Sequence, residues 1–139
     1  LVSPGKRIIS AVASARDGWF AVWRDDGTLA WHNPAGEVMH QFRLPPPQVV
    51  GAGIQALPGR RLLVPLVGEN RVAEVDRDGR EIRSISIESP LAVARLRDGG
   101  TVVTSPEGLT RLDPADRVLS RQRVDWLPVA LAVRHKAGP

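Results

Sequence analysis

The chain contains no cysteine and no tyrosine among its 139 residues. The lack of cysteine excludes disulfides, thiolate metal sites and cysteine nucleophiles, and it leaves the cellular compartment open. Long apolar runs are also missing, so no membrane span is expected. The opening letters LVSPGKR lack the basic-then-apolar order of a signal peptide, so we expect no targeting segment. Because the chain does not begin with methionine, we expect it to be processed or incompletely observed.

Basic residues are in only small excess over acidic residues, with 19 against 15. All the basic residues except Lys6 and Lys136 are arginines, and they are spread along the chain beside Asp and Glu. The isoelectric point is near 10.9 because no Tyr or Cys titrates below the arginines. A nucleic-acid binder usually concentrates its positive charge on one face. Nucleic acid is therefore not the expected partner.

A repeat of about forty residues runs through the chain. Its glycines follow one another at separations of 41, 40 and 39 residues, by subtraction from Gly18 through Gly59 and Gly99 to Gly138. A second turn recurs out of phase with the first, as NPAG at 33–36, DRDG at 76–79 and DPAD at 113–116. Two apolar columns precede this turn: Leu29, Val72 and Leu109, and then His32, Val75 and Leu112.

The residue types of the second turn predict its backbone conformation. Asn or Asp at its first position can accept hydrogen bonds from the backbone, and proline at the next position fixes φ near −65°. Glycine at the fourth position takes the left-handed conformation that closes a hairpin. Asp116 replaces that glycine in the third copy, and Asp tolerates the same conformation. Each copy therefore predicts a hairpin between two strands.

The segments between the turns read as short strands without sustained helical periodicity, so essentially no helix is expected. In the middle copy these strands are 49–56, 61–66, 71–76 and 81–87. Four strands in forty residues, repeated in tandem, are typical of a β-propeller blade. The first strands, at 9–15, 49–56, 91–96 and 129–133, are rich in Ala and Gly, as expected where blades crowd around an axis.

The residues at 68–85, GENRVAEVDRDGREIRSI, resemble an NHL-type propeller repeat. Such repeats run as Asn, a basic residue, alternating apolar residues, Asp-x-x-Gly and a strand. The stretch is also similar to quinoprotein-like and arylsulfotransferase-like repeats. The resemblance implies an all-β propeller segment of three four-stranded antiparallel blades, at about 7–48, 49–90 and 91–128. Residues 129–139 would then supply the innermost strand of a further blade.

Three blades do not close a ring, since closed propellers have about four blades or more. We therefore expect further blades of the same chain, copies of the chain or another protein to complete it. The open faces of the first and third blades are expected to carry Val12, Trp23, Leu29, Val102, Leu109 and Leu112.

No catalytic, cofactor-binding or metal-ligating set is predicted. His32, His40 and His135 do not stand at metal-ligand spacing, although a propeller could gather ligands from different blades. The carboxylates lie in turns that are too short for a calcium loop. No nucleophile with a paired base can be identified.

Two sets of residues are candidates for binding. Polar residues stand four positions before each glycine of the first turn, where they would face a central channel that attracts anions or reach solvent at its rim. Three of the four tryptophans belong to the first copy, where they would form either a partner surface or blade core. The channel set is Ser14, Gln55, Arg95 and Arg134, and the partner-surface set is Trp19, Trp23 and Trp31.

The sequence leaves three functions open. The first is a non-enzymatic propeller module that offers a rigid surface for protein interaction or assembly. The second is part of a propeller enzyme, a lyase, hydrolase or sulfotransferase, whose catalytic residues lie in other blades. The third is an RNA-binding NHL-type propeller, against which the mixed charge pattern and few aromatics argue.

Overall fold

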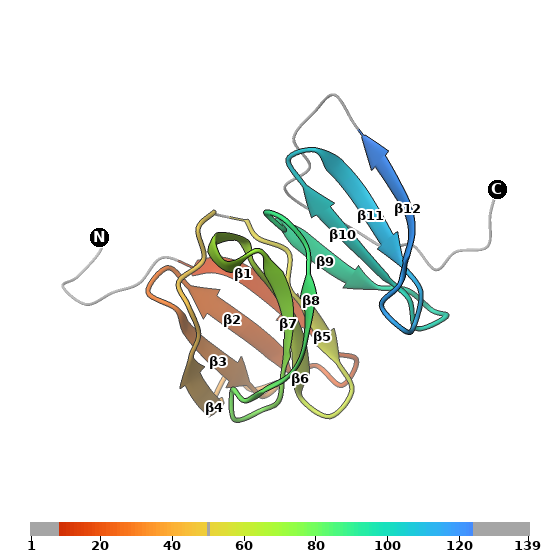
Figure 1. Cartoon of the computed structure of the whole chain (residues 1–139). Helices are drawn as coiled ribbons and strands as arrows, with labels where there is room; N and C mark the ends of the chain where they lie inside the picture. Colours follow the sequence, from red (N-terminus) through yellow and green to blue (C-terminus); the bar gives the residue numbers. More distant parts are fainter. Residues whose placement is uncertain (1–8, 50, 124–139) are drawn as a thin grey trace.

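Three antiparallel sheets follow one another along the chain in a computed structural model that describes residues 9–49 and 51–123 (Figure 1). Each sheet has four strands in chain order, from an inner to an outer strand. Blade 1 contains β1 (Ile9–Ser14), β2 (Phe20–Arg24), β3 (Thr28–His32) and β4 (Val38–Arg43). Blade 2 contains β5 (Gln55–Leu57), β6 (Arg61–Leu66), β7 (Arg71–Val75) and β8 (Glu81–Ser86). Blade 3 contains β9 (Ala92–Arg95), β10 (Thr101–Ser105), β11 (Gly108–Leu112) and β12 (Val118–Arg123).

The predicted all-β architecture of three four-stranded antiparallel sheets is confirmed. The one helical element in the described ranges is η1 (Val67–Glu69), a single 3₁₀ turn between β6 and β7. No helix in these ranges is long and apolar enough to cross a membrane. The further strand predicted within 129–139 lies outside the described residues.

The second turn of each repeat has the predicted geometry. The Oδ1 atom of Asn33 accepts hydrogen bonds from the backbone N–H groups of residues 35 and 37. Asp76 and Asp113 accept the equivalent pairs of bonds in the other blades. These bonds stabilise the carboxylate form and lower the pKa of both aspartates. Asp116 takes the glycine position with a φ of 65°.

The innermost strand of blade 2 is shorter than the predicted 49–56, because its first residues bond to neighbouring blades instead of to β6. Gly51 N–H donates to the Ser10 carbonyl of blade 1. Gly53 N–H donates to Leu91 O, and Val93 N–H donates to Gly53 O, which forms a parallel bridge to blade 3. The backbones approach so closely that a Cβ on Gly53 would lie 2.5 Å from the Ala92 Cβ. This contact explains why small residues are needed on the inner strands.

Each blade has a preceding face, toward the blade before it in the chain, and a following face, toward the next blade. The following face of blade 1 packs on blade 2 through a core that includes Trp23, Trp31 and Leu29. A second core joins blades 2 and 3. It consists of Leu57, Leu63, Val72, Ile85, Ile87, Val93, Val103 and Leu112.

The expected residues of the open faces need correction. Trp23 and Leu29 are fully buried in the core between blades 1 and 2, and Leu112 is buried between blades 2 and 3. Side chains along a strand point alternately to the two faces of its sheet. An assignment that is wrong by one residue therefore places a side chain on the wrong face. Val12, Val102 and Leu109 belong to the outward-pointing set.

Replacing Gly53 by alanine tests the close approach of the inner strands. We expect Gly53→Ala to lower the free energy of unfolding by about 1–3 kcal/mol, the usual cost of overpacking. Gly68→Ala is the matched control, since its Cβ would meet only the Gln48 side chain at 3.4 Å. Thermal unfolding at one protein concentration measures both variants. Equal midpoints for the two would contradict the close approach.

Candidate functional site

The predicted channel residues do not form one structural column. Strand pairing joins Phe20, Leu62 and Thr101 to the apolar column of His32, Val75 and Leu112. On their other side these same residues pair with Ser14, Ala56 and Arg95. The blade 2 residue equivalent to Ser14 and Arg95 is therefore Ala56. Gln55 lies one position earlier, so its side chain points to the opposite face of the sheet. Counting back from Gly59 failed because that glycine lies one position earlier in its loop than Gly18 and Gly99.

The structure nevertheless brings two of the predicted channel residues together. Gln55 accepts a hydrogen bond from the Arg95 backbone N–H, at 3.4 Å, across the boundary between blades 2 and 3. Ser14 is exposed on the preceding face of blade 1, away from both. Arg134 lies outside the described residues. A channel mouth that attracts anions stays a prediction.

The Arg95 guanidinium takes part in a charged cluster at one end of the boundary between blades 2 and 3. At its centre is Glu74, whose side chain is only 6% exposed. Arg61 bonds to Glu74 at 2.5 Å, while Arg83 and Arg95 approach it at 3.6 and 3.9 Å. Arg83 also pairs with Asp116 of blade 3 at 3.3 Å. Burial lowers the pKa of the Arg95 guanidinium, and repulsion from Arg83 adds to the effect.

This cluster was missed in the sequence, although a signal for it existed. Glu74 is a charged residue between the apolar residues Ala73 and Val75 of β7, at a position where blade 1 carries Trp31. A buried carboxylate must be paired, so its presence there indicated that cations lie close to it. The cluster joins blades 2 and 3 and has the character of a structural contact.

The tryptophans proposed as a partner surface are mostly core. Trp23 and Trp31 are fully buried between blades 1 and 2, so of the two expected alternatives blade core holds for both. Trp19 is half-buried, and the Arg60 guanidinium of blade 2 lies over its ring at 3.8 Å. Arg60 also bonds to Asp17 at 2.6 Å and thereby lowers the pKa of that carboxyl. Trp19 thus belongs to a contact between two blades.

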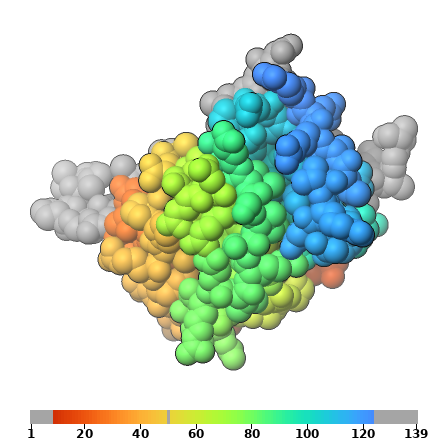
Figure 2. Space-filling view, viewed as in Figure 1, coloured from red at the N-terminus to blue at the C-terminus, as the bar shows by residue number. Residues whose placement is uncertain are grey.

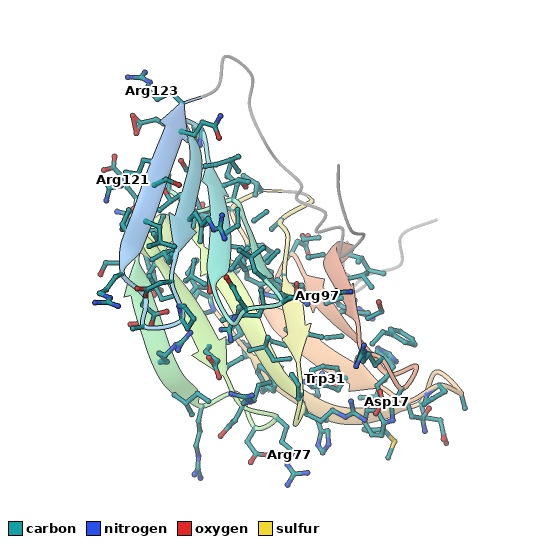
Figure 3. The ribbon with its side chains drawn as sticks, turned by 90° about the vertical axis from the view of Figure 1, so that its right-hand side faces the viewer. Asp17, Trp31, Arg77, Arg97, Arg121 and Arg123 are labelled. Atoms are coloured by element: carbon teal, nitrogen blue, oxygen red, sulfur yellow. The ribbon has the colours of Figure 1, made fainter. Side chains whose placement is uncertain are left out.

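A polar groove of about 670 Å³ runs between blades 2 and 3 at the end opposite the charged cluster. Arg121 and Arg123 of β12 line one side, and Glu88 of the β8–β9 connection lines the other. Figure 2 shows the β8 and β12 regions next to each other on the surface, and Figure 3 shows both arginines along β12. None of the three forms an ion pair with another residue that the structure describes. The groove is a concave polar surface on the described part of the chain.

The histidines do not form a metal site in the described part of the chain. No group of three or more His, Asp or Glu side chains there could hold a metal ion. His32 stacks on Phe20 with ring centroids 4.8 Å apart, and His40 stacks on Trp19 at 6.2 Å. His135 lies outside the described residues.

The preceding face of blade 1 is uncovered at a position that is core in the other blades. Val12 lies two residues before Ser14 and is 57% exposed. Its equivalents, Ile54 two residues before Ala56 and Val93 two residues before Arg95, are 9% and 3% exposed. Both equivalents pack on the blade that precedes them in the chain. The face that carries Val12 therefore has the character of a blade-packing surface.

Comparison with solved structures identifies the architecture. Virginiamycin B lyase from Staphylococcus aureus is similar at a TM-score of 0.64 and 16% identity, over 90% of this chain and 44% of that chain. BBS1N, solved in complex with ARL6DN, is similar at 0.64 and 16% identity, over 90% and 42%. The fold is a partial β-propeller.

Two further observations complete the comparison. The computationally designed Ika4 protein is similar at a TM-score of 0.65 and 15% identity, over 96% of this chain and 84% of that chain. The chain spans 62% of a protein of unknown function from Bacteroides caccae, at 15% identity and a TM-score of 0.58. No protein-family model and no curated protein matches the sequence.

Removing the Glu74 carboxylate tests the charged cluster. Glu74→Ala leaves Arg61, Arg83 and Arg95 without their shared partner, and we expect a loss of about 2–3 kcal/mol in the free energy of unfolding. This value is below that for a fully buried pair because the arginines are partly exposed. Glu107→Ala, at an exposed position, is the control, with an expected change within about 0.5 kcal/mol. Thermal unfolding at fixed concentration compares them. A Glu74→Ala variant as stable as the control would show that the cluster does not join the blades.

Proposed function

We propose that this chain is a non-enzymatic β-propeller module whose role is protein interaction or assembly. Its blades pack against further blades of the same chain, a second copy or another protein. The observation that carries the proposal is the exposure of Val12, at a position where both equivalents are buried against a preceding blade. A rigid ring of blades suits such a binding role, although the fold itself does not specify a function.

The free-energy cost of leaving the open faces in water supports the same proposal. At about 25 cal/mol per Å², a few hundred Å² of apolar surface left in water at the two open faces would cost roughly 5–10 kcal/mol. That cost is similar to the whole stability of a typical domain, roughly 5–15 kcal/mol. A neighbour at these faces removes the cost. The module is therefore expected to be stable only with a partner in place.

Part of a propeller enzyme is the second candidate, because the similar structures include lyases. In that case the catalytic residues lie partly in blades outside this chain. The longer reading frame distinguishes the two functions, since the enzyme requires a set of His, Asp or Ser side chains in those blades.

RNA binding by an NHL-type propeller is the third candidate. Exposed arginines without a partner among the described residues, such as Arg77 and Arg97, would have to supply the electrostatic contact. A salt titration tests it, because phosphate contacts give a steep loss of affinity with salt. A flat profile favours the protein-binding module.

Substitution at the open face tests the proposal. We expect the isolated chain to associate, or to lack a cooperative unfolding transition. Val12→Asp should lower the association by at least roughly tenfold, because it places a charge in an apolar interface. Ile82→Asp is the matched control, since Ile82 is exposed on the outer strand of a blade that has both neighbours. Light scattering over a concentration series measures both variants. A monodisperse 15.1 kDa species that unfolds cooperatively would contradict the proposal.

A further inference from the structure

Both blade boundaries contain a polar contact between neighbouring blades near one end. Trp31 and Glu74 occupy equivalent positions, each just before the β-bulge of its sheet, on the following face of blades 1 and 2. In the first boundary the Arg60 guanidinium of blade 2 lies 5.5 Å from the Trp31 ring centroid. In the second boundary the guanidinium of Arg95 from blade 3 approaches Glu74 at 3.9 Å. Each boundary therefore places an arginine of one blade against a complementary group of its neighbour.

Blade 3 carries Arg111 at the third equivalent position, again just before a β-bulge. Its side chain is 53% exposed, whereas Trp31 and Glu74 are buried. Among the described residues it pairs with the Asp98 carboxylate, at 3.8 Å and 60% exposed, which is a weak surface ion pair. Arg111 therefore presents a guanidinium on the following face of blade 3, where blades 1 and 2 have interface residues.

The preceding face of blade 1 offers a complementary surface. Phe20 and His32 stack across β2 and β3 with ring centroids 4.8 Å apart and ring planes within 3°. The equivalent pairs, Leu62 with Val75 and Thr101 with Leu112, are buried against the preceding blade. Guanidinium groups stack favourably on aromatic rings, as Arg60 does on Trp19 within this molecule.

We propose that a second copy of this chain covers the preceding face of blade 1, and that Arg111 of that copy stacks on the Phe20–His32 ring pair. The inference rests on the proposed packing role, and it names the partner and the contact. It follows from complementarity, since the exposed Arg111 guanidinium and the stacked rings lie at corresponding places on the two open faces of one chain. The three blades that the structure describes in each copy make six in two copies, within the range of about four to eight that closed propellers contain. The contact is head-to-tail, and a head-to-tail contact forms a ring when its rotation closes.

Substitution of Arg111 in the 139-residue chain tests the contact between copies. Arg111→Ala should raise the dissociation constant of the assembly by about 3–30-fold, the range expected for a cation on an aromatic face. Arg77→Ala removes an exposed arginine from a turn of blade 2 and should leave the dissociation constant unchanged. Sedimentation equilibrium measures the constants, and circular dichroism confirms that each variant keeps its strand content.

A mixing experiment tests the head-to-tail geometry. Val12→Asp blocks the preceding face of blade 1, and Arg111→Glu blocks the following face of blade 3, so each variant alone should be monomeric. Mixed together, the two should form a heterodimer through the one intact pair of faces. Two results would overturn this inference alone. In the first, the unmodified chain associates and neither Arg111 variant weakens that association. In the second, the mixture of the two blocked variants stays monomeric. A stable, cooperatively unfolding monomer of the unmodified chain would overturn the proposed packing role as well.

Discussion

Packing of each sheet against a neighbour on both faces is the constraint on which the structure depends. Blade 2 meets this constraint completely, since Val64 and Val75 pack toward blade 1 while Leu63 and Val72 pack toward blade 3. Both faces of such a sheet must be apolar, and alternate residues of each strand must serve opposite interfaces. Blades 1 and 3 carry the same alternation, with one neighbour each among the described residues. The exposure of Val12 follows directly from that difference.

Crowding at the inner strands and charge near the ends of the boundaries complete the packing. Gly53 lets the blade 2 backbone bond directly to blade 3, which a side chain would prevent. Farther from this contact, Arg60 and the Glu74 cluster join successive blades by polar contacts. Such contacts are directional, whereas apolar burial is not. The cores thus supply most of the stabilisation, and the polar contacts favour one arrangement of neighbouring blades.

The fold could be predicted because its signals are local. An Asn or Asp that accepts two backbone hydrogen bonds, as Asp113 does, marks a hairpin whatever surrounds it. The assignment of side chains to faces was less predictable, since a shift of one residue reverses it. Gln55 was misplaced for that reason, and Trp23 and Trp31 were considered for a surface although they are core. The Glu74 cluster depends on residues from two blades, and spacing along one repeat does not show which arginines meet.

Hydrogen–deuterium exchange at two protein concentrations tests most directly the claim that the end blades need a neighbour. Amides of β6 and β7 in the middle blade should stay protected at both concentrations. Amides of β1 and β2 should lose protection on dilution, because their open face is then no longer covered. Equal and concentration-independent protection of all three blades would contradict the account.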